Sequence, residues 1–298
     1  MAKIMTDHLF SGTGVALVTP FDANGNVDVA SLNKLVRHTL DNGVDFLVAL
    51  GTTSEAPTLN NAEKELVVNT ILDAASSRCK VMLGMGGNNT KAIVDQLDKG
   101  IPDGISGILS VVPYYNKPQQ NGITEHFKAI ADKSPVPVIL YNVPGRTAAN
   151  MTAQTCLELA QHPNIIGVKE ASGDLQQIMT IIQRKPDDFA VLSGDDALTF
   201  PMIALGAVGV ISVAANAFCK EFSTMVNLAL EDRMEEASRL HYQMLNRMNL
   251  LFAEGNPAGI KALLEIMGIC GSTTRLPLLE ASNQLKAKLK EEFISNQN

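Results

Sequence analysis

The sequence predicts an α/β protein, a TIM (β/α)8 barrel with a C-terminal helical appendage. Eight short apolar, β-branched runs recur between residues 14 and 213, and helical patterns fill most of the gaps between them. Most runs are continuous rather than alternating, which is typical of parallel strands covered on both faces. The eighth run, and the lack of a GxGxxG motif after the first, favour a barrel over the alternative, a doubly wound sheet.

The expected strands lie at 14–18, 45–50, 80–85, 106–111, 137–142, 165–169, 189–193 and 208–213. Apolar residues at helical spacing separate them, and Asn60 with Glu63 three residues later resembles a capping box. After residue 232 no convincing strand follows, and helices are expected at 233–252, 257–267 and 278–293. We therefore divide the chain into a barrel at 1–232 and a C-terminal helical region at 233–298.

Composition and charge exclude several classes of protein. The 298 residues are 46% hydrophobic and 18% charged, as in an ordinary globular chain. The 24 Lys and Arg residues are outnumbered by 31 Asp and Glu residues, giving a net charge of −7. This balance argues against a nucleic-acid partner and against an anionic membrane surface.

Two segments bear on membranes and export. The N-terminal MAKIMTDHLF has no apolar core of signal-peptide length, so we expect a cytoplasmic protein. The uncharged stretch 197–219 has the length of a membrane span. It also contains Pro201, Gly206 and Gly209, so a short buried helix followed by a buried strand explains it better.

The cysteines and histidines give no sign of a metal site. The four cysteines include no CxxC pair, and the five histidines form no HxxxH or HExxH pair. We expect reduced thiols and no protein-bound metal.

Barrel active sites lie at the C-terminal ends of the strands, so the strand list is also a list of candidate site residues. Three of the four tyrosines fall at these ends, as does one lysine that directly follows an apolar run. The candidate ends are 19–20, 51–55, 86–89, 113–116, 141–142, 169–170, 193–196 and 212.

Lys169 is the most informative of these residues. It ends a buried strand and would point into the barrel mouth, where partial desolvation favours the neutral amine. A neutral buried amine can attack a carbonyl and form a Schiff base. The alternative is an ion pair with Glu170 or with another acid at the rim; alternation along a strand puts Lys169 and Glu170 on opposite faces, which argues against the first of these pairs.

Schiff-base chemistry also needs groups that move protons. Tyr141 and Tyr115 are candidates, and Thr52 could bridge the two phenols; each tyrosine could equally be a packed aromatic. The turn 51–55, GTTSE, is rich in hydroxyls and backbone N–H groups and suits a carboxylate, or else caps the next helix. Arg146 could hold a second carboxylate, or be a solvated loop residue.

Together these segments resemble the dihydrodipicolinate synthase family of pyruvate-dependent class I aldolases. The resemblance covers nearly the whole chain, and several ordered motifs are far more specific than any one of them. The motifs are GTTSE (51–55), PYYNKP (113–118), YNVPGRT (141–147), GVKEASGD (167–174), LSGDD (192–196) and GVIS (209–212).

The resemblance implies a catalytic set. Lys169 would form the Schiff base with pyruvate. Tyr141, Thr52 and Tyr115 would form a proton relay, with Tyr115 reaching across from a neighbouring subunit.

The resemblance also implies a set of substrate-binding residues. Thr53 would contact the pyruvate carboxylate, and Gly194 and Ile211 would line the pocket. Arg146 would hold the carboxylate of aspartate semialdehyde. Ser54 departs from the glycine usual in the family and leaves the fine geometry of that turn open.

Arg146 separates the close relatives. N-acetylneuraminate lyases and sugar-acid aldolases share the lysine and the tyrosine but generally lack this arginine. The expected activity is therefore condensation of pyruvate with L-aspartate 4-semialdehyde to 4-hydroxy-tetrahydrodipicolinate, in diaminopimelate and lysine biosynthesis. The alternatives are such an aldolase or a non-catalytic barrel that binds a keto acid.

The resemblance implies no cofactor, small-molecule substrates as the only ligands, and a homotetramer built as a dimer of dimers. Relatives that lysine inhibits bind it near the 51–55 turn through histidine and glutamate. The matching positions here are Asn61, Lys64 and Ala92, so we expect weak or absent inhibition. Tyr114 and Asn88 do match, so a residual site is an alternative.

Overall fold

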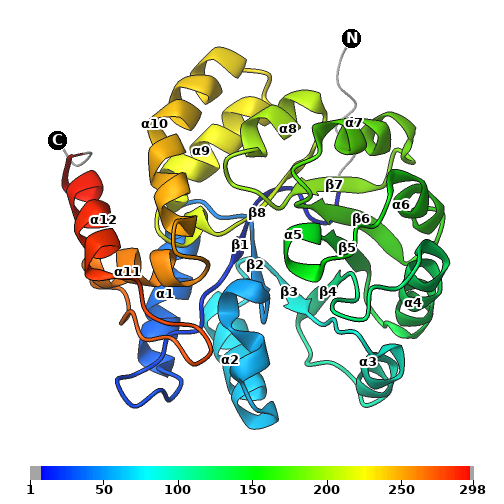
Figure 1. Cartoon of the computed structure of the whole chain (residues 1–298), viewed down its shortest axis with the longest axis horizontal. Coiled ribbons are helices and arrows are strands. Elements are labelled where there is room, and N and C mark those ends of the chain that lie inside the picture. The colour runs from blue at the N-terminus through cyan, green and yellow to red at the C-terminus, as the bar shows by residue number, and fades with distance from the viewer. Residues whose placement is uncertain (1–7, 296–298) are drawn as a thin grey trace.

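The computed structural model describes residues 8–295, and within them eight parallel strands close into a barrel in sequence order (Figure 1). The predicted (β/α)8 barrel is confirmed. Each of the eight expected runs forms a strand, with ends shifted by at most a few residues. The expectation about a signal peptide concerns mainly residues 1–7, which lie outside the described residues.

The barrel closes where β1 pairs with β8, with Gly12 opposite Gly209. A Cβ atom on Gly209 would lie 2.2 Å from the Gly12 carbonyl oxygen, so only glycine allows this approach. The strands are β1 Gly12–Ala16, β2 Phe46–Ala49, β3 Lys80–Gly84, β4 Ile105–Val111, β5 Val138–Asn142, β6 Ile165–Glu170, β7 Ala190–Ser193 and β8 Gly209–Ser212.

Helices follow the strands and cover the barrel. The predicted capping box is present, since Asn60 accepts from the Glu63 N–H and Glu63 accepts from the Asn60 N–H. The helices of the barrel are α1 Val29–Asp41, α2 Asn61–Ala75, α3 Thr90–Leu97, α4 Gln120–Lys133, α5 Pro144–Thr147, α6 Ala153–Leu159, α7 Leu175–Arg184, α8 Thr199–Leu205 and α9 Cys219–Leu230. Three short 3-10 helices are η1 Thr52–Ser54, η2 Ala56–Thr58 and η3 Ala214–Asn216.

Alternation along the strands divides the core into two layers. Residues that face outward pack against the helices in one large cluster. Residues that face inward fill the barrel and include Phe46, Val48, Tyr141, Leu192 and Ile211. The inward layer ends at the carboxyl ends of the strands, where the candidate site residues begin.

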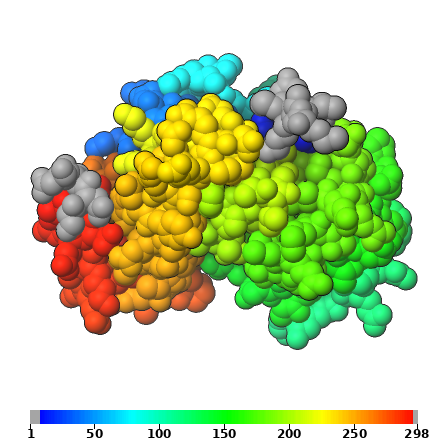
Figure 2. Space-filling model, turned by 90° about the horizontal axis from the view of Figure 1, so that it is seen from above, coloured from blue at the N-terminus to red at the C-terminus, as the bar shows by residue number. Residues whose placement is uncertain are grey.

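Three helices form the C-terminal region: α10 Met234–Phe252, α11 Ala258–Ile266 and α12 Asn283–Ser295. Seen from above, they make up one side of the molecule (Figure 2). The first two match the predicted ranges to about a residue. The third begins later than predicted because Ser282 caps it, accepting from the Leu285 N–H, and Glu254 in turn binds Ser282.

The uncharged stretch at 197–219 folds as expected. It forms α8, then β8 and η3, and all three lie within the barrel fold. Within residues 8–295, none of the helices combines the length and apolarity that crossing a bilayer would require.

Candidate active site

Lys169 and Tyr141 form the centre of the site. They are paired positions on the neighbouring strands β6 and β5, so their side chains point to the same side of the sheet. The Lys169 Nζ atom lies 4.4 Å from the centroid of the Tyr141 ring. Lys169 is 5% exposed and Tyr141 7%, so both side chains are buried at the carboxyl ends of their strands.

Glu170 faces the other way, as alternation predicts. Its carboxylate accepts hydrogen bonds from Asn142 and Gln177 at 2.8 and 2.9 Å, and from the Ser172 hydroxyl at 2.6 Å. These contacts occupy both oxygens of Glu170 outside the barrel. The amine of Lys169 is therefore left without this acid as a partner.

Gly194 makes room for the lysine. A Cβ atom there would lie 2.9 Å from the Lys169 Cε atom and 2.7 Å from the Ala171 Cβ atom. Ile211 lies on β8 in the same inward layer as Tyr141. The structure thus places Lys169 beside Tyr141 and Gly194, and it places Ile211 in the same buried cluster as Tyr141.

Asp196 is a buried acid whose charge interacts with that of Lys169. One carboxylate oxygen accepts from the backbone N–H groups of Val213 and Ala214 at 3.2 and 2.8 Å. Burial raises the pKa of Asp196 to about 6, while the hydrogen bonds and the charge of Lys169 act in the opposite direction. Asp196 thus ties the segment that follows β7 to the start of η3.

The 51–55 turn carries the two predicted threonines. Thr52 is exposed at the start of η1, whereas Thr53 is 2% exposed. The Thr53 hydroxyl accepts a hydrogen bond of 2.9 Å from the amide nitrogen of Asn256. The other side-chain atom of Asn256, Oδ1, is buried without a hydrogen-bond partner among the described residues.

Tyr115 and Arg146 lie on the loops that follow β4 and β5. Tyr115 has φ +74° and its side chain is 88% exposed, so this chain alone does not bury it in the pocket. Arg146 lies in α5, one short turn after β5, and is also exposed. Both are at the correct end of the barrel, but no hydrogen bond of theirs to Lys169 or Tyr141 occurs within the described residues.

The sequence did not identify two residues that the structure adds as functional candidates, Asn256 and Glu55. Asn256 comes from the link between α10 and α11, not from a strand end, so the rule that found the other residues could not reach it. Glu55 belongs to the GTTSE motif but was assigned no role; it forms a fully buried ion pair with Lys261. No local signal marks Lys261, because a lysine within a helix normally reads as a surface residue.

The arrangement suits covalent chemistry on a carbonyl compound. A buried amine without an ion-pair partner can act as a nucleophile, and a phenol beside it can move protons. Within residues 8–295, no group of three or more His, Cys, Asp or Glu side chains could hold a metal ion.

Comparison with known proteins decides the family. The sequence model of the dihydrodipicolinate synthetase family matches residues 9–296. The chain belongs to this family. Comparisons of sequence and of structure both find relatives that match this chain along almost its whole length.

A 4-hydroxy-tetrahydrodipicolinate synthase of Flavobacterium psychrophilum is 50% identical over 281 residues, which are 94% of this chain and 96% of the relative. A dihydrodipicolinate synthase structure from Aquifex aeolicus has a TM-score of 0.93 at 41% identity and covers 97% of this chain and 98% of its own. A chloride-inhibited dihydrodipicolinate synthase from Acinetobacter baumannii, solved with pyruvate, has a TM-score of 0.92 at 38% identity; the match covers 95% of this chain and 98% of that one.

Proposed function

We infer that this protein is a lyase that condenses pyruvate with L-aspartate 4-semialdehyde. The product is 4-hydroxy-tetrahydrodipicolinate, on the route to diaminopimelate and lysine. The observation that carries this conclusion is the pair formed by the buried Lys169 amine and the Tyr141 ring, 4.4 Å apart, in a member of the dihydrodipicolinate synthetase family.

The first half of the reaction forms a nucleophile on pyruvate. The Lys169 amine attacks the ketone carbon, and loss of water from the carbinolamine gives an iminium. The iminium draws electrons, so a methyl proton leaves and an enamine forms. Tyr141 would carry protons in these steps, and Thr52 and Tyr115 would extend the relay to solvent.

The second half joins the two substrates. The enamine carbon attacks the aldehyde carbon of the semialdehyde, whose carboxylate Arg146 would hold through two parallel hydrogen bonds. The amine of the bound semialdehyde then attacks the iminium, closes the ring and releases Lys169. Thr53 would contact the pyruvate carboxylate, while Gly194 and Ile211 would line the pocket that encloses it.

We further propose that Tyr115 acts in a neighbouring subunit and that the protein is a homotetramer built as a dimer of dimers. The 88% exposure of Tyr115 in the single chain supports this assignment, because an exposed tyrosine beside a barrel mouth can complete the pocket of a second copy. We also propose that the protein acts in the cytoplasm, where its free cysteines would stay reduced.

The decisive assay is pyruvate consumption with aspartate semialdehyde, with N-acetylmannosamine and a sugar aldehyde as control acceptors. We expect consumption only with the semialdehyde. Arg146→Ala should raise the KM for the semialdehyde much more than the KM for pyruvate. Turnover of the sugar acceptors at a similar rate would contradict the assignment.

The role of Tyr115 has its own test by mixing two inactive variants. A mixed dimer of Lys169→Ala and Tyr115→Phe contains one site with both intact residues if Tyr115 crosses the interface. Activity should therefore reappear on mixing. If mixing restores no activity while native mass spectrometry shows mixed oligomers, Tyr115 acts within its own chain.

A further inference from the structure

The C-terminal region holds the 51–55 turn through a buried ion pair. The Lys261 ammonium on α11 donates to Glu55 Oε1, and both side chains are 0% exposed. The same ammonium donates to the Thr273 carbonyl at 2.8 Å and lies 4.1 Å from the centroid of the Phe21 ring. Glu55 directly follows Thr52–Ser54, so the pair anchors the turn at its end.

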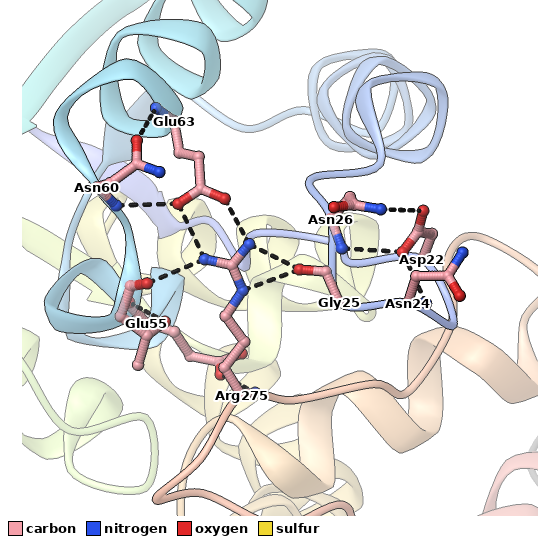
Figure 3. Close-up of polar contacts among 9 residues, drawn as sticks. Asp22, Asn24, Gly25, Asn26, Glu55, Asn60, Glu63 and Arg275 are labelled. Carbon is pink, nitrogen blue, oxygen red and sulfur yellow. Dashed lines mark hydrogen bonds and ion pairs between the residues drawn. The ribbon is translucent and has the colours of Figure 1, made fainter.

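Arg275 connects Glu55 with Glu63 in the first turn of α2. Its backbone N–H donates to Glu55 Oε2 at 2.9 Å, and its guanidinium binds both carboxylate oxygens of Glu63 (Figure 3). The guanidinium also donates to the carbonyls of Gly25 and Thr58. The hydrogen bond from Arg275 is the main reason that the pKa of Glu63 falls to about 2.

Asn256 adds a third point of contact from the same region. It binds the Thr53 hydroxyl at 2.9 Å and lies five residues before Lys261. The link into α11 and the helix itself therefore contact the turn at Thr53 and at Glu55. Both contacts join residues that are more than 200 positions apart in the chain.

Stability alone is a poor reason to keep the Glu55–Lys261 pair. Removing two charges from water costs so much solvation that apolar replacements of such pairs are often equally stable. Glu55 also adopts a left-handed conformation at φ +55°, which is unfavourable for a residue with a side chain. A buried ion pair instead fixes the positions of the two groups that it joins.

We propose that Glu55 and Lys261 are positioning residues, which hold Thr52 and Thr53 in the place that pyruvate binding requires. This inference rests on the proposed function. Neither residue touches the substrate; each acts through the turn. The C-terminal helices are then part of the pyruvate site, although the lysine and tyrosine that perform the chemistry come from the barrel.

Three variants test the proposal: Glu55→Gln, Lys261→Met, and the two combined. Each single variant leaves one buried charge unpaired, so the thermal midpoint should fall and the KM for pyruvate should rise about tenfold, the effect of weakening one charge-assisted hydrogen bond. The combined variant leaves no unpaired charge, so its midpoint should recover, while its KM for pyruvate stays raised.

The matched control removes another Glu–Lys pair of the same region, Glu265 and Lys286, whose 3.2 Å contact joins α11 to α12 away from the turn. Glu265→Gln with Lys286→Met should leave the KM for pyruvate unchanged. A combined Glu55/Lys261 variant whose KM returns to the native value along with its midpoint would overturn the proposal.

Borohydride trapping separates this proposal from the proposed function. At saturating pyruvate, the Glu55 and Lys261 variants should still form the reduced adduct at Lys169. Absence of an adduct in the native protein would instead refute the lyase assignment.

Discussion

Two buried lysines of this molecule differ in their partners. Lys261 lies on α11, is fully buried, and forms an ion pair with Glu55. Lys169 ends β6, is 5% exposed, and contacts the Tyr141 ring, while no carboxylate of the described residues forms an ion pair with its amine. The acid next to it in sequence, Glu170, is turned outward and fully engaged.

Lys261 and Lys169 illustrate two different roles of a buried amine. Burial lowers the pKa of Lys261, and the carboxylate of Glu55 opposes this shift by stabilising the ammonium. A lysine held in this way is a charged structural contact. The Lys169 amine forms no ion pair with a carboxylate of the described residues, although its charge acts on the buried Asp196, and we propose that this amine attacks the substrate carbonyl.

The largest expected effect follows from removing the reactive amine. Lys169→Ala should lower turnover by at least about a thousandfold, because no other group can form the covalent intermediate. The thermal midpoint should stay close to the native value, since no ion pair is broken. Steady-state kinetics and circular dichroism of the same preparation measure both; native-like turnover in Lys169→Ala would remove the distinction between the lysines.

Lys261→Met should instead lower the stability of the protein. It leaves the Glu55 carboxylate buried and unpaired, which costs about 3–5 kcal/mol of unfolding free energy. Denaturant unfolding measures the loss. A stability equal to that of the native protein would mean that water, or the Arg275 N–H that already donates to Glu55, stabilises the remaining carboxylate.

Gly194→Ala probes the space around the reactive amine. The new methyl group would lie 2.9 Å from the Lys169 Cε atom, so the lysine must shift. We expect a loss of about 1–3 kcal/mol in stability and slower adduct formation with pyruvate. The matched control is Gly145→Ala, where no atom lies within 4 Å of the added Cβ; equal effects at both sites would count against this account.

His126 extends the comparison to a third buried base. Its Nδ1 atom contacts the Thr90 hydroxyl at 2.9 Å, and burial lowers the pKa of the ring to about 4. The unfolded chain therefore binds this proton more readily than the folded chain, so stability is lost as the pH falls from about 6.5 to 4. The thermal midpoint of His126→Asn should change less over that range; an equally steep profile would assign the loss to other groups.

The smallest expected effect concerns lysine as a ligand. Asn61, Lys64 and Ala92 supply no carboxylate to hold its amine, and Lys64 adds a cation. We expect little or no inhibition, measured as initial rate against lysine concentration. Inhibition at micromolar lysine would show that the site uses other groups, with Asn88 and Tyr114 as the first to test.

The barrel and the placement of Lys169 beside Tyr141 could be predicted because local pattern determines both. Apolar runs mark the strands, alternation decides which side chains point inward, and the end of a run places Lys169 and Tyr141 at the mouth. Asn256 and Lys261 could not be found in this way. Their contacts depend on how the C-terminal helices fold back onto the turn, over a separation of more than 200 residues.

The role of Lys169 as nucleophile is tested most directly by borohydride reduction of the native protein with pyruvate, followed by peptide mapping of the modified lysine. We expect one reduced pyruvate adduct per chain, located at Lys169, with Lys261 unmodified. An adduct at Lys261, or none at Lys169, would contradict the assignment of the unpaired lysine as the nucleophile.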